Sequence, residues 1–122
     1  MATEAKERVK RGTELLDKVD PRWWTSVDLP RFSISSDTMC VFGQRYGRFE
    51  AGKAIYGLNG NAGEFGFHAL DHDTSVMERA VAQEWSDVVG ERQRRMNPLS
   101  KMFLGLRREW REWRAQFRVN LD

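Results

Sequence analysis

Residues 75–95 read SVMERAVAQEWSDVVGERQRR, and this stretch has the strongest local pattern of the chain. Its apolar residues recur every three or four positions, as in a helix with one apolar face. That face holds Met77, Val81, Trp85, Val88 and Val89. Ser75, followed by Glu78 three positions later, has the spacing of a capping box at a helix start. The sequence therefore predicts a long amphipathic helix that begins at Ser75.

Three shorter segments upstream predict further helices. Residues 4–19 combine good helix formers with spaced apolar positions, and Pro21 should end that helix because the residue before a proline disfavours the α conformation. Residues 37–46 follow serine and aspartate cap candidates, and the next helix runs from about Phe49 to Gly57. The predicted fold is mainly α: a small helical module of about four helices plus a long C-terminal amphipathic helix.

Trp23 and Trp24 fall in the connection after the first helix. Large aromatic residues in such a connection more often supply packing area than contact a ligand. We therefore expect both rings to lie over the core as a lid.

Composition narrows the classes of function. The chain has 122 residues, which is the usual size of a single domain. Its net charge of +2 is too small to indicate nucleic-acid binding by itself. The longest apolar runs are far shorter than the roughly 20 residues that a membrane helix needs, and residues 1–20 lack the apolar core of a secretory signal. We therefore expect a cytoplasmic protein. The single cysteine, Cys40, sits among apolar neighbours, which predicts a buried and unreactive thiol.

Residues 57–73 contain what little the chain offers for chemistry. The glycines spaced three apart lack the patterns that direct backbone amides at phosphate. The cluster His68, Asp71, His72 and Asp73 has metal-like composition, but it directly precedes the long helix and is better explained as a solvated turn. We therefore expect no enzyme activity, no metal, no cofactor and no small-molecule substrate.

The C-terminal segment carries the most distinctive pattern. Asn97-Pro98 breaks the chain, which divides it into a module at 1–95, a hinge at 96–99 and a helix at 100–119. Residues 1–95 hold 14 basic and 15 acidic side chains, whereas the last 27 residues hold six basic and three acidic. An aromatic and aliphatic stripe at helical spacing lies beside a stripe of arginines. We expect partner contacts from Phe103, Leu106, Arg107, Trp110, Arg111, Trp113, Arg114 and Phe117.

Four interpretations of this segment compete. The apolar stripe could fold back as the last core helix, because such stripes usually belong to a core. It could pack on a second copy or on a helix of another protein, for which the three-four spacing is suited. Tryptophan beside arginine also suits a helix lying on a membrane surface. Nucleic acid is the least favoured partner, because no DNA-reading motif accompanies the arginines.

One segment of the module is similar to a known family. The carrying residues are Trp24, Val27-Asp28-Leu29, Cys40–Gly47 (CVFGQRYG), Gly57-Leu58, Gly66-Phe67 and Trp85. Over residues 10–95 the chain resembles a family of small uncharacterised proteins from actinobacteria and their phages. That family usually has leucines where this chain has Phe42 and Arg45. The resemblance implies a phage or host setting and names no activity, so we expect a non-enzymatic interaction or assembly protein.

Overall fold

The computed structural model describes residues 2–96, and this part is mainly helical. It contains four α-helices: α1 (Ala2–Val19), α2 (Val41–Tyr46), α3 (Phe49–Tyr56) and α4 (Ser75–Arg94). Three short 3-10 helices lie between them: η1 (Trp23–Ser26), η2 (Leu29–Arg31) and η3 (Ala62–Phe65). No β-strand occurs between residues 2 and 96, so the predicted fold class is confirmed. The predicted helix at 100–119 lies outside the described residues.

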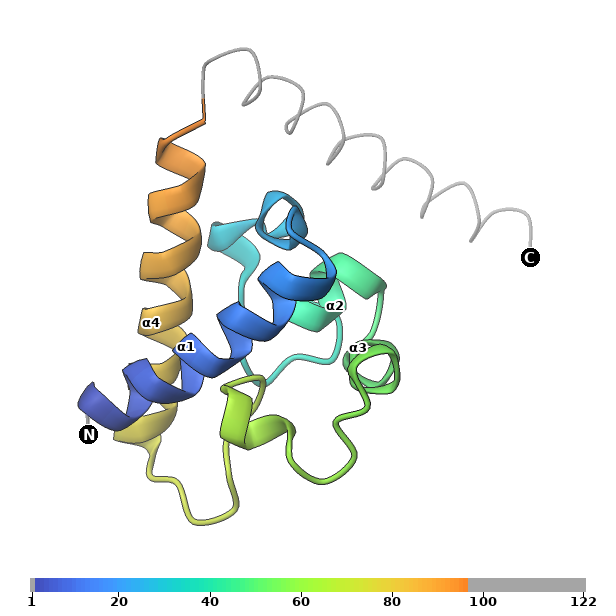
Figure 1. Cartoon of the computed structure of the whole chain (residues 1–122). Coiled ribbons are helices and arrows are strands. Elements are labelled where there is room, and N and C mark those ends of the chain that lie inside the picture. The colour runs from blue at the N-terminus through green and yellow to red at the C-terminus, as the bar shows by residue number, and fades with distance from the viewer. Residues whose placement is uncertain (1, 97–122) are drawn as a thin grey trace, which may run out of the picture.

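The four helices form two pairs around a common core. α1 crosses α4 and packs on it, while the short helices α2 and α3 pack on each other at the other side of α1 (Figure 1). η3 lies against α1, and η1 contacts both α2 and α4. The core therefore lies between the crossed long helices and the short pair.

The two long helices form where the apolar spacing predicted them. α1 buries Ala5, Val9 and Leu16, and α4 buries Met77, Val81, Trp85 and Val89. None of these side chains is more than 6% exposed. The amphipathic pattern thus identified most of the buried face of both helices. Val19, at the end of the apolar positions of the first helix, is the exception, because it is 56% exposed.

The short helix α2 begins four residues later than the sequence indicated. Its N-cap is Cys40, whose Sγ accepts a hydrogen bond from the Gly43 amide at 3.3 Å. The predicted caps are engaged elsewhere: Ser36 Oγ accepts from the Met39 amide, and Asp37 accepts from the Phe49 amide at the start of α3. Side chains that bond nearby backbone amides in this way compete with helix formation.

Both short helices end at the glycines that the sequence marked. Gly47 has a φ of 96° and Gly57 a φ of 66°, conformations that a residue with a Cβ rarely adopts. The predicted ends of α2 and α3 are therefore confirmed.

The centre of the core is aromatic. Trp23 and Trp85 are at most 1% exposed, and their rings meet edge to face with centroids 5.6 Å apart. Both indole N–H groups are satisfied, Trp23 by Asp17 at 2.9 Å and Trp85 by the Gly66 carbonyl at 2.6 Å. Burying an aromatic side chain of 150–250 Å² contributes roughly 4–6 kcal/mol before entropy costs. The expected lid is therefore wrong for Trp23, which is a central core residue.

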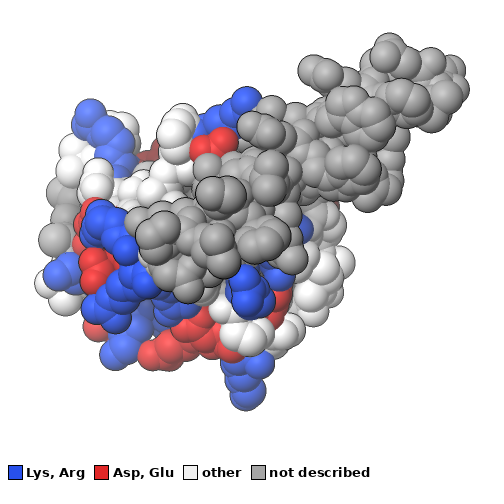
Figure 2. Space-filling view, turned by 90° about the horizontal axis from the view of Figure 1, so that it is seen from above, with Lys and Arg blue, Asp and Glu red and all other residues white. Residues whose placement is uncertain are grey.

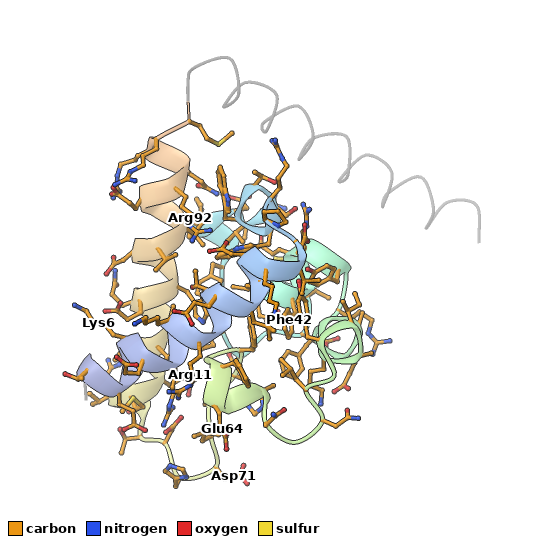
Figure 3. All side chains as sticks on the ribbon, viewed as in Figure 1. Lys6, Arg11, Phe42, Glu64, Asp71 and Arg92 are labelled. Atoms are coloured by element: carbon orange, nitrogen blue, oxygen red, sulfur yellow. The ribbon has the colours of Figure 1, made fainter. Side chains whose placement is uncertain are left out.

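Phe42 organises the second half of the core. Its ring stacks on Phe67 with centroids 3.9 Å apart and on Tyr56 with centroids 5.5 Å apart. Phe42 is fully buried, and Figure 3 labels it close to the short helices α2 and α3. Gly52 leaves room for this ring, since a Cβ there would lie 2.2 Å from Phe42 Cγ.

Candidate functional site

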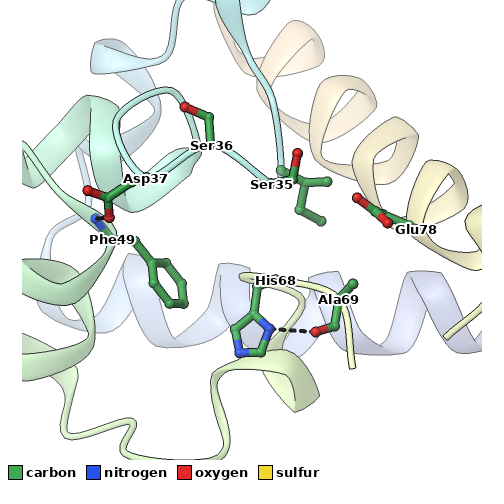
Figure 4. A pocket seen from close by; sticks show the side chains of 8 residues that line it. Ser35, Ser36, Asp37, Phe49, His68, Ala69 and Glu78 are labelled. Carbon is green, nitrogen blue, oxygen red and sulfur yellow. Dashed lines mark hydrogen bonds between the residues drawn. The ribbon is translucent and has the colours of Figure 1, made fainter. Parts of the chain in front are cut away.

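A groove runs between the loop at residues 33–37 and the first two turns of α4. It consists of two adjoining cavities of about 280 and 490 Å³, which share Ile34, Ser35 and Glu78. The smaller cavity extends to Phe49 and His68 (Figure 4). The larger extends along α4, where it is lined by Ser75, Arg79 and Ala82. We refer to the two cavities together as the α4 groove.

The loop wall is held by hydrogen bonds to its own backbone and to α2. Ser33 N–H donates to the Met39 carbonyl at 3.2 Å, and the Met39 amide donates to Ser36 Oγ at 3.1 Å. Gln44 of α2 also donates to the Met39 carbonyl, at 2.9 Å. Ile34 is thereby turned inward, 8% exposed, and forms the apolar floor of the groove.

The helix that forms the α4 wall begins at Ser75, as predicted, but its N-cap is the residue before. Thr74 is the N-cap, and its Oγ1 accepts from the Met77 amide at 3.1 Å. The expected capping box of Ser75 with Glu78 is therefore wrong, because the third residue of the helix is Met77. The Glu78 side chain is left half-buried with no hydrogen-bond or ion-pair partner in the described part of the chain, and its carboxylate points into the groove (Figure 4).

His68 closes one end of the α4 groove. Its Nδ1 donates to the Ala69 carbonyl at 2.5 Å, and its ring meets Phe49 edge to face at 5.3 Å between centroids. His68 therefore contributes a polar end to a groove with an apolar floor.

The metal-like cluster of the sequence does not assemble into a ligand set. Asp73 is held by Arg8, whose guanidinium contacts its two carboxylate oxygens at 2.7 and 3.1 Å. Asp71 and His72 are exposed, and Figure 3 shows Asp71 on the outer part of the loop before α4. Between residues 2 and 96 no group of three or more His, Cys, Asp or Glu side chains could hold a metal ion.

The geometry also gives no activated nucleophile in the described residues. None of their serine hydroxyls hydrogen-bonds to a histidine, and Cys40 uses its sulfur as a helix cap. Burial raises the pKa of the Cys40 thiol, and the side chain is 2% exposed. The predicted buried thiol is confirmed, and a protonated thiol is a poor nucleophile.

A second polar cluster joins the end of α1 to α2. Arg45 donates twice to Asp20 at 2.8 Å, and Tyr46 donates to the same carboxylate at 2.8 Å while its hydroxyl contacts that of Tyr56. The hydrogen bonds from Arg45 lower the pKa of Asp20, whereas burial raises the pKa of Tyr46. Tyr46 thus remains a protonated donor, and the cluster satisfies its own hydrogen bonds as a structural brace.

The residues of the segment Cys40–Gly47, which is part of the family resemblance, have structural roles in the module. In CVFGQRYG, Cys40 caps α2, Phe42 fills the core and Gln44 supports the groove loop. Arg45 and Tyr46 bond Asp20, and Gly47 ends the helix. The residues of this segment therefore serve to stabilise the module.

Surface charge on the described module is mixed. On the face seen in Figure 2, lysine and arginine side chains are interspersed with aspartate and glutamate. None of the helices in residues 2–96 has the length and apolar character needed to cross a membrane.

The α4 groove could not be predicted from the sequence, because its two walls are about 40 residues apart in the chain.

The predicted partner-binding residues lie outside the described part of the structure: Phe103, Leu106, Arg107, Trp110, Arg111, Trp113, Arg114 and Phe117. They remain predictions from the sequence, as does the resemblance to the actinobacterial and phage family. No protein-family model, no curated protein and no solved structure matches this chain.

Proposed function

We propose that this protein is a non-enzymatic interaction or assembly protein whose helical module carries residues 99–119 for self-association or for docking on a protein partner. The observation that carries the proposal is a contrast in how arginine is used. In the module, three arginines are committed to ion pairs between distant elements, Arg8 with Asp73, Arg45 with Asp20 and Arg92 with Asp17.

The C-terminal segment has the opposite character. Its arginine stripe faces few acidic residues, and only Arg108 with Glu112 has the spacing of a favourable helical pair. Trp110 and Trp113 lie in the adjacent aromatic stripe, and tryptophan and arginine are enriched among residues that dominate binding energy at interfaces. The chemistry of the segment therefore favours a protein partner, which includes a second copy.

The proposed setting is a phage or its actinobacterial host. It rests on the resemblance over residues 10–95 and places the protein in the host cytoplasm or in the phage particle. A protein that acts on a host component or joins a larger assembly suits that setting.

Light scattering of the full chain over a concentration series tests the proposal. Self-association raises the mass with concentration, and replacing the two stripe tryptophans (Trp110→Ala with Trp113→Ala) should abolish the rise. A control in the same segment, Glu112→Gln with Gln116→Ala, should leave it unchanged. Affinity capture from actinobacterial lysate compares the proteins recovered by the wild type and by the tryptophan variant. The proposal is wrong if the wild type stays monomeric and both recover the same proteins.

A membrane surface is the second candidate partner, because tryptophan beside arginine suits an interfacial helix. Co-sedimentation with vesicles containing anionic lipid would separate the two. Binding that needs Trp110 and Trp113 and vanishes on neutral vesicles favours the membrane.

A further inference from the structure

The α4 groove has an unbalanced charge. Glu78 projects a half-buried carboxylate into it without a partner among the described residues. Asp37 adds a second carboxylate at the loop end, and this one is ion-paired with Arg48 at 3.4 Å. Arg79 is the one cation among its lining residues, and its Nε is engaged by the Ser75 carbonyl at 3.3 Å. The groove therefore favours a positively charged occupant.

The end of the groove between Glu78 and His68 suits a long side chain. The cavity there measures about 280 Å³, slightly below the roughly 300–1,000 Å³ of small-molecule sites, whereas the adjoining cavity along α4 measures about 490 Å³. The floor of the smaller cavity is apolar at Ile34 and Phe49, and its rim is polar. Arginine fits both features, since its stem packs on apolar surface while its guanidinium pairs with carboxylate.

We propose that the α4 groove receives an arginine side chain from residues 99–119 of a second copy of the chain, an inference that rests on the self-association proposed above. Charge complementarity is the argument. That segment holds Lys101 and five arginines against Glu109 and Glu112, whereas the module to residue 95 is nearly balanced. Each copy has the α4 groove and the segment 99–119. If the segment of each copy binds the groove of the other, the two copies form a dimer with two-fold symmetry.

The test compares two arginine substitutions on α4 in the full-length protein. Glu78→Arg places a cation in the groove, and Glu84→Arg makes the same charge change on the same helix at a residue that does not line it. Light scattering over a concentration series gives the dimer dissociation constant of each. We expect Glu78→Arg to raise that constant about tenfold or more, and Glu84→Arg to change it by less than about threefold.

Ser35→Arg is a second groove variant, because Ser35 is an exposed loop residue that lines both cavities and a substitution there spares the helix. Circular dichroism and thermal unfolding identify the variants that fold. A wild-type dimer that Glu78→Arg and Ser35→Arg weaken no more than Glu84→Arg does would overturn the groove inference and leave self-association standing. A wild type that is monomeric at every concentration overturns the self-association itself, and the groove inference with it.

Discussion

The ion pair between Arg8 and Asp73 should be the most sensitive charged contact of the module. Both side chains are almost fully buried, 3% and 2% exposed, and they join α1 to the residue just before the N-cap of α4. Asp73 also accepts from the Leu70 amide at 2.7 Å. Replacing Asp73 by alanine would leave a buried guanidinium and a backbone amide without this carboxylate.

The expected cost follows from burial. Removing one partner of a buried ion pair destabilises a protein by about 3–5 kcal/mol. Glu4 remains bonded to Arg8 at 2.7 Å, but its side chain is 57% exposed and offsets little of the loss. We therefore expect Asp73→Ala to lower the free energy of unfolding by about 3 kcal/mol, which lowers the melting temperature by roughly 12–24 °C in a domain of this size.

Urea and thermal unfolding measure this cost, with Asp71→Ala as the matched control. Asp71 is exposed and lies two residues before Asp73, so its substitution should change stability by less than about 0.5 kcal/mol. A loss below about 1 kcal/mol for Asp73→Ala would refute the reasoning, because it would show that the pair adds little over its desolvation cost.

The pH dependence gives a second check on the same pair. The hydrogen bonds from Arg8 hold the pKa of Asp73 below its ordinary value. A carboxyl whose pKa is lowered by folding adds stability above its unfolded pKa of about 3.9, and that stability is lost as pH falls through the folded value. The stability gap between wild type and Asp73→Ala should therefore be full at neutral pH and narrow below about pH 4.

Two further substitutions test how the helices start and pack. Thr74→Ala should cost about 1 kcal/mol in chemical unfolding because it removes the α4 cap, whereas Ser75→Ala should cost less than half of that; equal costs would contradict the assigned N-cap. Gly52→Ala should cost about 1–3 kcal/mol because its Cβ would displace the buried Phe42 ring, and an unchanged unfolding midpoint would show that the ring yields freely.

The elements that could be predicted from the sequence are those that depend on residues close together in the chain. The spacing of Val9 and Leu16 marked the buried face of α1, and the spacing of Val81 and Trp85 marked that of α4, because helical periodicity is a pattern of nearby residues. Gly47 also ended a helix as predicted, since the left-handed conformation is a property of one residue.

The parts that sequence analysis missed depend on contacts between distant residues. Trp23 entered the core because Trp85, 62 positions later, packs against it. Thr74 and Ser75 are both good caps, and the choice between them rests on where the loop meets the helix. With Thr74 as the N-cap, Glu78 has no capping role and lines the α4 groove instead, so the candidate site could not be predicted from spacing.

The two walls of the α4 groove are held by separate sets of contacts. The Arg8–Asp73 pair fixes the start of α4 against α1, while Gln44 of α2 holds the loop wall through the Met39 carbonyl. An occupant that bridges Glu78 and Asp37 would join these two parts of the module. Occupation of the groove should therefore slow hydrogen exchange in both the 33–39 loop and the first turn of α4, whereas a partner that contacts α4 alone would protect only the helix.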